Sequence, residues 1–166
     1  MHWMLMPLRR YAEFSGRSRR KEYWMFFLGV ILFYILMLVL MMALGGGAML
    51  AADNPAGMTG ALAGAGIIGI IFLLAMLALL IPSLAVGIRR LHDIDRTGWW
   101  MLAGYGPYLL SIVLAFSGSV ELAGILNLIS LAGFLLLLVF AVLPGTPGPN
   151  RYGPDPKGRA DEEIFA

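Results

Sequence analysis

Four long stretches of apolar residues limit this chain to a membrane-spanning fold. They cover residues 23–44, 61–88, 99–116 and 125–143. A helix needs about 20 apolar residues to cross a bilayer, so each stretch is long enough to span. The composition agrees, because 60% of the chain is hydrophobic and only 13% is charged. A soluble domain carries about 25% charged residues, so we exclude a soluble globular fold, and the abundance of apolar residues excludes a disordered chain.

The sequence therefore predicts an all-α integral membrane protein with four transmembrane helices packed as a bundle. We expect one membrane domain over residues 1–158, followed by a short polar C-terminal tail at 159–166. Residues 144–158 are too rich in proline and glycine for a regular helix, and Pro144 ends the fourth span. Residues 1–14 are too short to span, and two interpretations stay open: an interfacial segment or a partly ordered terminus.

The positive charges predict the orientation of the chain in the membrane. All 12 Lys and Arg residues lie in three segments, at 1–22, 89–98 and 144–166, and the loops at 45–60 and 117–124 contain none. Positive residues mark the cytoplasmic side of a membrane protein. Four spans place these three segments on the same side. We therefore expect a multi-pass protein of the bacterial inner (cytoplasmic) membrane with both its N- and C-termini in the cytoplasm.

Three charged motifs belong to these segments: GRSRRKEYW at 16–24, IRRLHDIDRTGWW at 88–100 and PGPNRYGPDP at 147–156. We expect them to converge in a cytoplasmic cap, made of charged loops and the Pro/Gly-rich tail. Local spacing predicts ion pairs of Arg89 with Asp93 and of Arg19 with Glu22. In the membrane, Asn127 and Ser130 share a helix face, which predicts an interhelical hydrogen bond.

The same motifs resemble those of a bacterial inner-membrane family, domain of unknown function 805 (DUF 805), the YhaH-like proteins. The resemblance covers roughly residues 14–156. It implies a small multi-span inner-membrane protein, and it supplies no activity and no catalytic residue. The residues that carry it are Gly16, Arg17, Arg20, Glu22, Tyr23, Trp24, Arg89, Arg90, His92, Asp93, Asp95, Arg96, Gly98, Trp99, Gly148, Asn150, Arg151, Tyr152 and Gly153.

Three functions remain possible from the sequence. The favoured one is a non-enzymatic binding or adaptor protein, whose basic face binds a protein partner, an anionic lipid or a phosphorylated ligand. A small oligomeric transporter or channel is the first alternative, although no charged residue lies in the central part of any span. The second is an interfacial enzyme that uses His92, Asp93 and Asp95. A metal site at these residues, or a nucleophile at Ser83, is disfavoured because no supporting motif surrounds them.

The candidate binding residues all lie in the three charged motifs. We expect no cofactor and no metal, and the absence of cysteine excludes thiolate chemistry. The expected partner is the membrane itself, with anionic phospholipid at the cytoplasmic rim. A protein partner or a homo-oligomer is also possible, whereas we expect no nucleic acid. The candidate residues are Arg17, Arg20, Glu22, Arg89, Arg90, His92, Asp93, Asp95, Arg96, Asn150, Arg151 and Tyr152.

Overall fold

The expected all-helical architecture is confirmed by a computed structural model, which describes residues 2–50 and 54–158. The four expected spans are present, with ends that differ by a few residues from those predicted. No strand occurs in the described ranges, where the tail forms only an isolated bridge between Asn150 and Gly153. The elements in chain order are α1 (His2–Arg9), α2 (Arg20–Leu50), α3 (Pro55–Asp93), the short 3-10 helix η1 (Gly98–Met101), α4 (Leu102–Phe116) and α5 (Val120–Val142).

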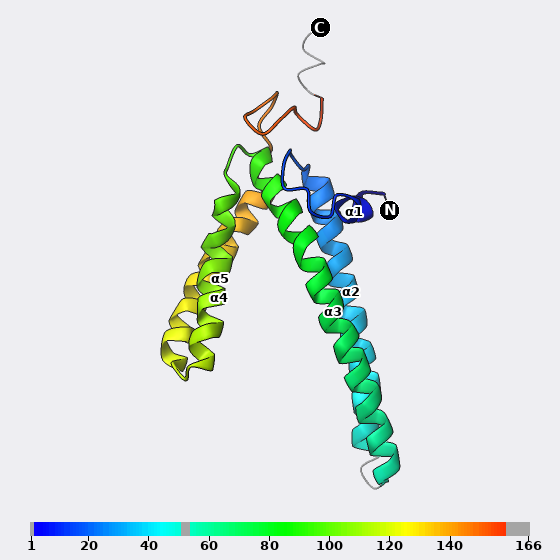
Figure 1. Ribbon diagram of the computed structural model, residues 1–166. Coiled ribbons are helices and arrows are strands. Elements are labelled where there is room, and N and C mark those ends of the chain that lie inside the picture. The colour runs from blue at the N-terminus through cyan, green and yellow to red at the C-terminus, as the bar shows by residue number, and fades with distance from the viewer. Residues whose placement is uncertain (1, 51–53, 159–166) are drawn as a thin grey trace.

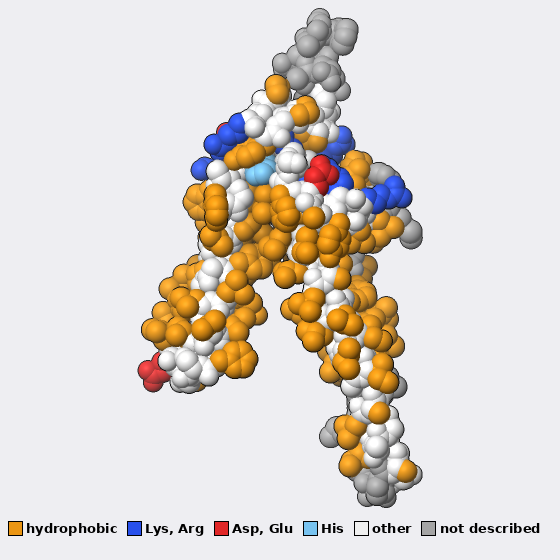
Figure 2. All heavy atoms as spheres, viewed as in Figure 1, with side chains coloured by type: hydrophobic (Ala, Val, Ile, Leu, Met, Phe, Trp, Pro, Cys, Tyr) orange, Lys and Arg blue, Asp and Glu red, His pale blue; other side chains and the backbone are white. Residues whose placement is uncertain are grey.

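The four long helices form two antiparallel hairpins that join at the charged end of the molecule and diverge away from it (Figure 1). One hairpin consists of α2 and α3, and the other consists of α4 and α5. Figure 2 shows apolar side chains along both arms and most charged side chains where the arms meet. Both ends of the described chain lie at this charged end, which we call the cap: residues 10–22, 89–98 and 144–158.

The four helices of the expected bundle are present, but they are arranged as two hairpins that open away from the cap. Contacts between the hairpins involve α5 with α2 and α3 near the cap, and the arms separate beyond it. Lipid chains are as apolar as leucine, so apolar helices gain little by packing together in a membrane unless small or polar residues meet. Small and polar residues meet in this way between α4 and α5, and α2 meets α3 through the buried pair of Glu22 and Arg89.

Close packing of α4 on α5 depends on two glycines. A Cβ atom on Gly133 would lie 2.0 Å from the carbonyl oxygen of Ala103, and one on Gly104 would lie 2.7 Å from the ring of Phe134. Two hydrogen bonds join the same helices, from Ser130 to the carbonyl of Gly104 at 2.7 Å and from Ser111 to Asn127 at 2.8 Å. The expected interhelical hydrogen bonding by Asn127 and Ser130 is therefore confirmed.

The N-terminal segment is ordered as a helix that packs on α2 and α3. Met4 of α1 fits over Gly29, where a Cβ atom would lie 2.8 Å from its side chain. Pro82 has no N–H group, so the carbonyl of Ala78, four residues earlier, lacks its usual helical donor. The hydroxyl of Tyr11 donates to that carbonyl at 2.5 Å. This segment therefore supplies the hydrogen bond that Pro82 removes from α3.

We predict that Gly133→Ala destabilises the α4–α5 hairpin, because its new methyl group would collide with backbone rather than with a movable side chain. Overpacking of this kind costs about 1–3 kcal/mol. The melting temperature of the purified protein in detergent should fall. Gly124→Ala is the matched control on the same helix, because nothing lies within 4 Å of its new methyl group. Equal melting temperatures for the two variants would contradict this account of the helix packing.

Candidate functional site

The cap is organised around the buried carboxylate of Asp93, which pairs with two arginines from different segments. Arg17, which precedes α2, approaches Oδ1 with Nη2 at 3.0 Å. Arg90, one turn earlier on α3, approaches Oδ2 with Nη1 at 2.6 Å. All three side chains are at most 5% exposed. Asp93 thus links the N-terminal segment to the end of α3.

The Arg17 side chain also holds the tail in place. Its guanidinium group donates to the carbonyl of Thr146 at 2.6 Å and to that of Gly148 at 2.7 Å. The backbone N–H of Thr146 donates to the carbonyl of Asp93 at 2.8 Å. Gly145 passes so close that a Cβ atom there would lie 2.1 Å from the Asp93 carboxylate. The tail therefore folds back onto the end of α3 rather than extending away from it.

Arg90 connects the two hairpins. Its Nε donates to the carbonyl of Ala141 at 3.1 Å, and Nη2 donates to the carbonyl of Leu143. These carbonyls lie at the C-terminal end of α5, where helical carbonyls lack intrahelical donors. A cation is also favoured there by the helix dipole. The junction of the hairpins therefore depends on an arginine from α3 that caps α5.

A second buried pair joins α2 to α3. Glu22 accepts from Arg89 at 3.3 Å, and Arg89 also donates to the carbonyl of Glu13 at 2.8 Å. The predicted local pairs, Arg89 with Asp93 and Arg19 with Glu22, are therefore wrong. The tertiary fold brings a different partner to each carboxylate. Glu13 pairs with Arg10 on the surface. The two hydrogen bonds from Arg10 lower the pKa of the Glu13 carboxyl group.

The tail and the 89–98 loop meet through ring and amide contacts. The His92 ring stacks on Tyr152 with 3.8 Å between centroids, and its Nδ1 lies 3.2 Å from the carbonyl oxygen of Gly16. Asn150 donates to the carbonyl of His92 at 2.9 Å. Arg151 pairs with Asp95 at 3.1 Å on the surface. The expected convergence of the three motifs is therefore confirmed.

His92, Asp93 and Asp95 contact different partners in the cap. Asp93 faces two buried arginines, and Asp95 faces Arg151 at the surface. The Ser83 hydroxyl donates to the carbonyl of Leu79 within its own helix. Across residues 2–50 and 54–158, no group of three His, Asp or Glu side chains is placed to hold a metal ion.

The remaining candidate arginines are less enclosed. Arg96 is exposed and lies 6.0 Å from the ring centroids of Trp100 and Phe140. Arg20 is half-buried, and its Nε is enclosed without a hydrogen-bond partner.

The sequence analysis did not identify Gly145, Thr146 or Tyr11 as functional residues. A signal was available for Gly145, which lies between two prolines in PGTPG, a composition typical of tight turns.

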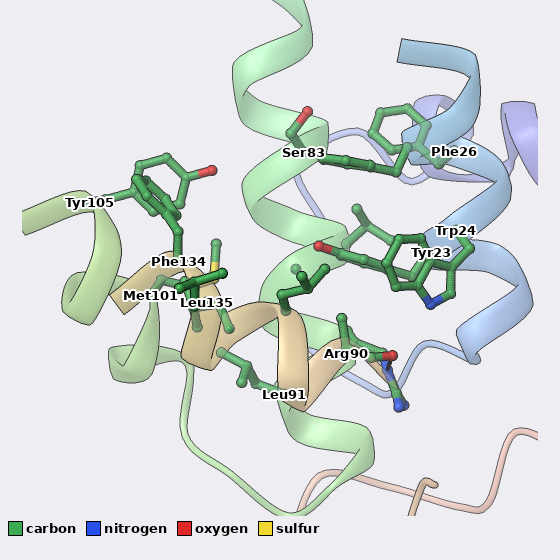
Figure 3. A pocket seen from close by; sticks show the side chains of 16 residues that line it. Tyr23, Trp24, Phe26, Ser83, Arg90, Leu91, Met101, Tyr105, Phe134 and Leu135 are labelled. Carbon is green, nitrogen blue, oxygen red and sulfur yellow. Dashed lines mark hydrogen bonds between the residues drawn. The ribbon is translucent and has the colours of Figure 1, made fainter. Parts of the chain in front are cut away.

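A pocket of about 420 Å³ lies where the hairpins diverge, on the membrane side of the cap. Figure 3 shows Tyr23 and Trp24 of α2 on one wall, with Tyr105 and Phe134 of the other hairpin facing them. The lining is mostly apolar, and Arg90 borders it beneath the cap. Within the described chain, neither tyrosine hydroxyl makes a hydrogen bond. Both point toward the gap between the hairpins (Figure 3).

We predict that Asp93→Asn loosens the cap, because two buried guanidinium groups lose their shared counter-charge. Breaking a buried ion pair costs about 3–5 kcal/mol. Trypsin should then cleave faster after Arg151 and Lys157 in the tail, and the melting temperature should fall. Asp95→Asn is the control, since an exposed pair contributes at most about 1 kcal/mol. Wild-type cleavage rates in Asp93→Asn would contradict the central role of this carboxylate.

Comparisons with known proteins agree with the membrane fold. The profile of the family described as "Protein of unknown function (DUF805)" matches residues 11–154. "Inner membrane protein YhaI" and "Inner membrane protein YhaH" of Escherichia coli (strain K12) are each 36% identical over 157 residues. The alignments cover 95% of this chain and 97% or 98% of the respective relative. No solved structure matches the chain. The chain belongs to the DUF805 family of inner membrane proteins.

Proposed function

We propose that this protein is a non-enzymatic binding protein of the inner membrane. Its cap faces the cytoplasm and binds anionic phospholipid headgroups through exposed cations. We call Arg9, Lys21 and Arg96 the cationic rim, since all three are exposed and lie in or next to the charged segments of the chain. The observation that carries the proposal is the lack of carboxylate partners for the rim. No acidic side chain of the described chain lies within ion-pair distance of these three residues.

Four acids of the cap, Glu13, Glu22, Asp93 and Asp95, cannot neutralise the rim, because each is paired with an arginine. Glu22 and Asp93 are buried against arginines. Glu13 and Asp95 pair with Arg10 and Arg151. The sequence suggested that Arg17, Arg89 and Arg90 bind the ligand. We now assign this role to the exposed cations instead. The guanidinium groups of those three are held inside the protein.

The surroundings of the rim suit a membrane surface. Lys21 lies 5.7 Å from the ring centroid of Trp3, and Arg96 lies beside Trp100. Tryptophan prefers the headgroup layer, and positive residues prefer the cytoplasmic side. Each Lys or Arg near an anionic surface contributes about 1 kcal/mol of attraction. These features support a lipid headgroup as the partner of the rim.

The two alternatives have weaker support. A transport path would need polar groups along the spans, yet the central parts of the spans carry no charged residue. An enzyme would need reactive groups that converge, whereas His92, Asp93 and Asp95 each face a different partner. Binding through the rim requires neither feature.

Neutralising the rim should remove most of the preference for anionic lipid. The test compares wild type with the triple variant Arg9→Gln, Lys21→Gln, Arg96→Gln, reconstituted in bilayers. Electron paramagnetic resonance of spin-labelled phosphatidylglycerol and phosphatidylcholine measures the relative association constants. Because salt screens surface charges, the wild-type preference should also weaken in 1 M NaCl, where the Debye length is about 3 Å.

The charge-preserving triple variant Arg9→Lys, Lys21→Arg, Arg96→Lys is the control, and it should keep the wild-type preference. Equal association constants for the two lipids in wild type would contradict the proposed function. The same holds for an unchanged preference in the neutralised variant.

The orientation can be tested by cysteine labelling, which has no background because the chain contains no cysteine. Ser117→Cys places a thiol at the far tip of the α4–α5 hairpin, and Lys157→Cys places one in the tail. A membrane-impermeant maleimide should label Cys at 117 in intact spheroplasts and label Cys at 157 only after lysis. The reverse pattern would place the cap in the periplasm and contradict the proposal.

A further inference from the structure

We propose that the pocket between the hairpins is a specific site for one anionic phospholipid. An acyl chain enters between the hairpins, and the phosphate lies beside Arg20. This inference rests on the proposed function and adds a defined site to it. The rim would attract many lipids at the surface, whereas the pocket would hold a single molecule. The argument combines the position of the pocket, its lining and the unbalanced charge at its cap end.

The position of the pocket points to a lipid of the leaflet on the cap side. The lining residues come from η1 and from the cap-side parts of all four long helices, inside the segments that are apolar enough to span. The hairpins diverge on the side away from the cap, and the space between the arms is open there (Figure 2). A volume of about 420 Å³ is in the range of small-molecule sites, roughly 300–1,000 Å³. In a bilayer, lipid chains are the apolar groups available to fill this space.

The lining suits a molecule with an apolar body and a polar end. Phe27, Val86 and Leu138 provide apolar contact along the walls. The hydroxyls of Tyr23 and Tyr105 face the same space without a hydrogen-bond partner in the described chain. They can donate to the ester or phosphate oxygens of a lipid, which a purely apolar groove could not do.

Arg20 supplies the charge at the cap end of the pocket. It precedes Tyr23 and Trp24 by three and four residues on α2, so it lies on the same helix face one turn closer to the cap. It also lies within Coulombic range of Arg90, which borders the pocket. Its Nε is enclosed and makes no hydrogen bond within the described chain. The enclosed Nε cannot reach a ligand, so the terminal Nη groups are the donors left for phosphate, which arginine binds well.

The local charge balance favours an anion. Arg17 and Arg90 share the carboxylate of Asp93, and no ion pair of Arg20 is found within the described residues. Glu22 lies on the other side of the network and pairs with Arg89. An anionic headgroup beside Arg20 would offset this excess of positive charge. A zwitterionic lipid would add an ammonium group to the same place and bind less well.

Native mass spectrometry of the full-length protein tests the site. The protein is equilibrated in detergent with equal amounts of phosphatidylglycerol and phosphatidylethanolamine and then activated to strip weakly held lipid. Wild type should retain one phosphatidylglycerol. Arg20→Gln should lower this retention about fivefold, the effect expected of one cation near the headgroup. Arg20→Lys should keep most of it. Lys157→Gln is the charge-matched control in the exposed tail, and it should behave as wild type.

A second pair of variants tests the acyl-chain part of the site. Leu138→Trp fills the pocket from α5 and should lower retention of both lipids. Val139→Trp is the matched control, because Val139 is similarly exposed but does not line the pocket. Leu135→Trp, which projects from the same helix into the pocket, replaces Leu138→Trp if that variant fails to fold. Millimolar glycerol phosphate should not displace the lipid. Displacement would identify a free phosphate compound as the ligand and overturn the proposal.

The outcomes separate this site from the proposed function. Wild-type retention of phosphatidylglycerol in Arg20→Gln, or in both pocket-filling variants, would overturn the pocket site. If lipid selectivity at the rim persists in that case, the binding function stands without the pocket. The rim variant leaves Arg20 intact, so it should lose its surface selectivity and still retain the single tightly bound lipid.

Discussion

The buried carboxylate of Asp93 is the interaction on which the rest of the cap depends. It neutralises Arg17 and Arg90, whose remaining donors bind the tail and the end of α5. A buried guanidinium group is costly without a counter-charge and a full set of acceptors. One carboxylate supplies the charge, and backbone carbonyls of the tail and of α5 supply the acceptors. The positions of the N-terminal segment, the tail and the second hairpin therefore all depend on the same residue.

Arginines at the charged end of the molecule have different roles. Arg17, Arg89 and Arg90 are buried and hold segments together. Arg9 and Arg96 are exposed, and Arg20 is half-buried on α2, one turn closer to the cap than the pocket residues Tyr23 and Trp24. The same residue type serves both roles because guanidinium groups bind carboxylates, carbonyls and phosphates with the same planar donors. Burial and the nearest acceptor decide the role of each arginine.

The two helices of each hairpin contact each other more extensively than the two hairpins contact one another. The α4–α5 pair uses Gly104, Gly133 and serine hydroxyls, which allow close approach in a membrane. The α2–α3 pair is supported at its cap end by Glu22 with Arg89 and by the Tyr11 bond near Pro82. Between the hairpins, contact is confined to the cap end. The resulting gap lies between two apolar arms, and we propose that a lipid occupies its cap end.

The sequence by itself determined the spans, the helical class and the segments that form the cap. Runs of apolar residues and clustered charges act locally, through the cost of placing polar groups in lipid, so they can be read residue by residue. The pairings were decided only by the tertiary structure. Neighbour spacing favoured Arg89 with Asp93 and Arg19 with Glu22, yet Asp93 pairs with Arg17 across the fold and Glu22 pairs with Arg89. From the sequence alone, several arginines are equally good partners for one carboxylate. Only the packing of the folded chain decides which of them lies close enough to pair. For the same reason the opening between the hairpins, and the pocket at its apex, could not be predicted from the sequence.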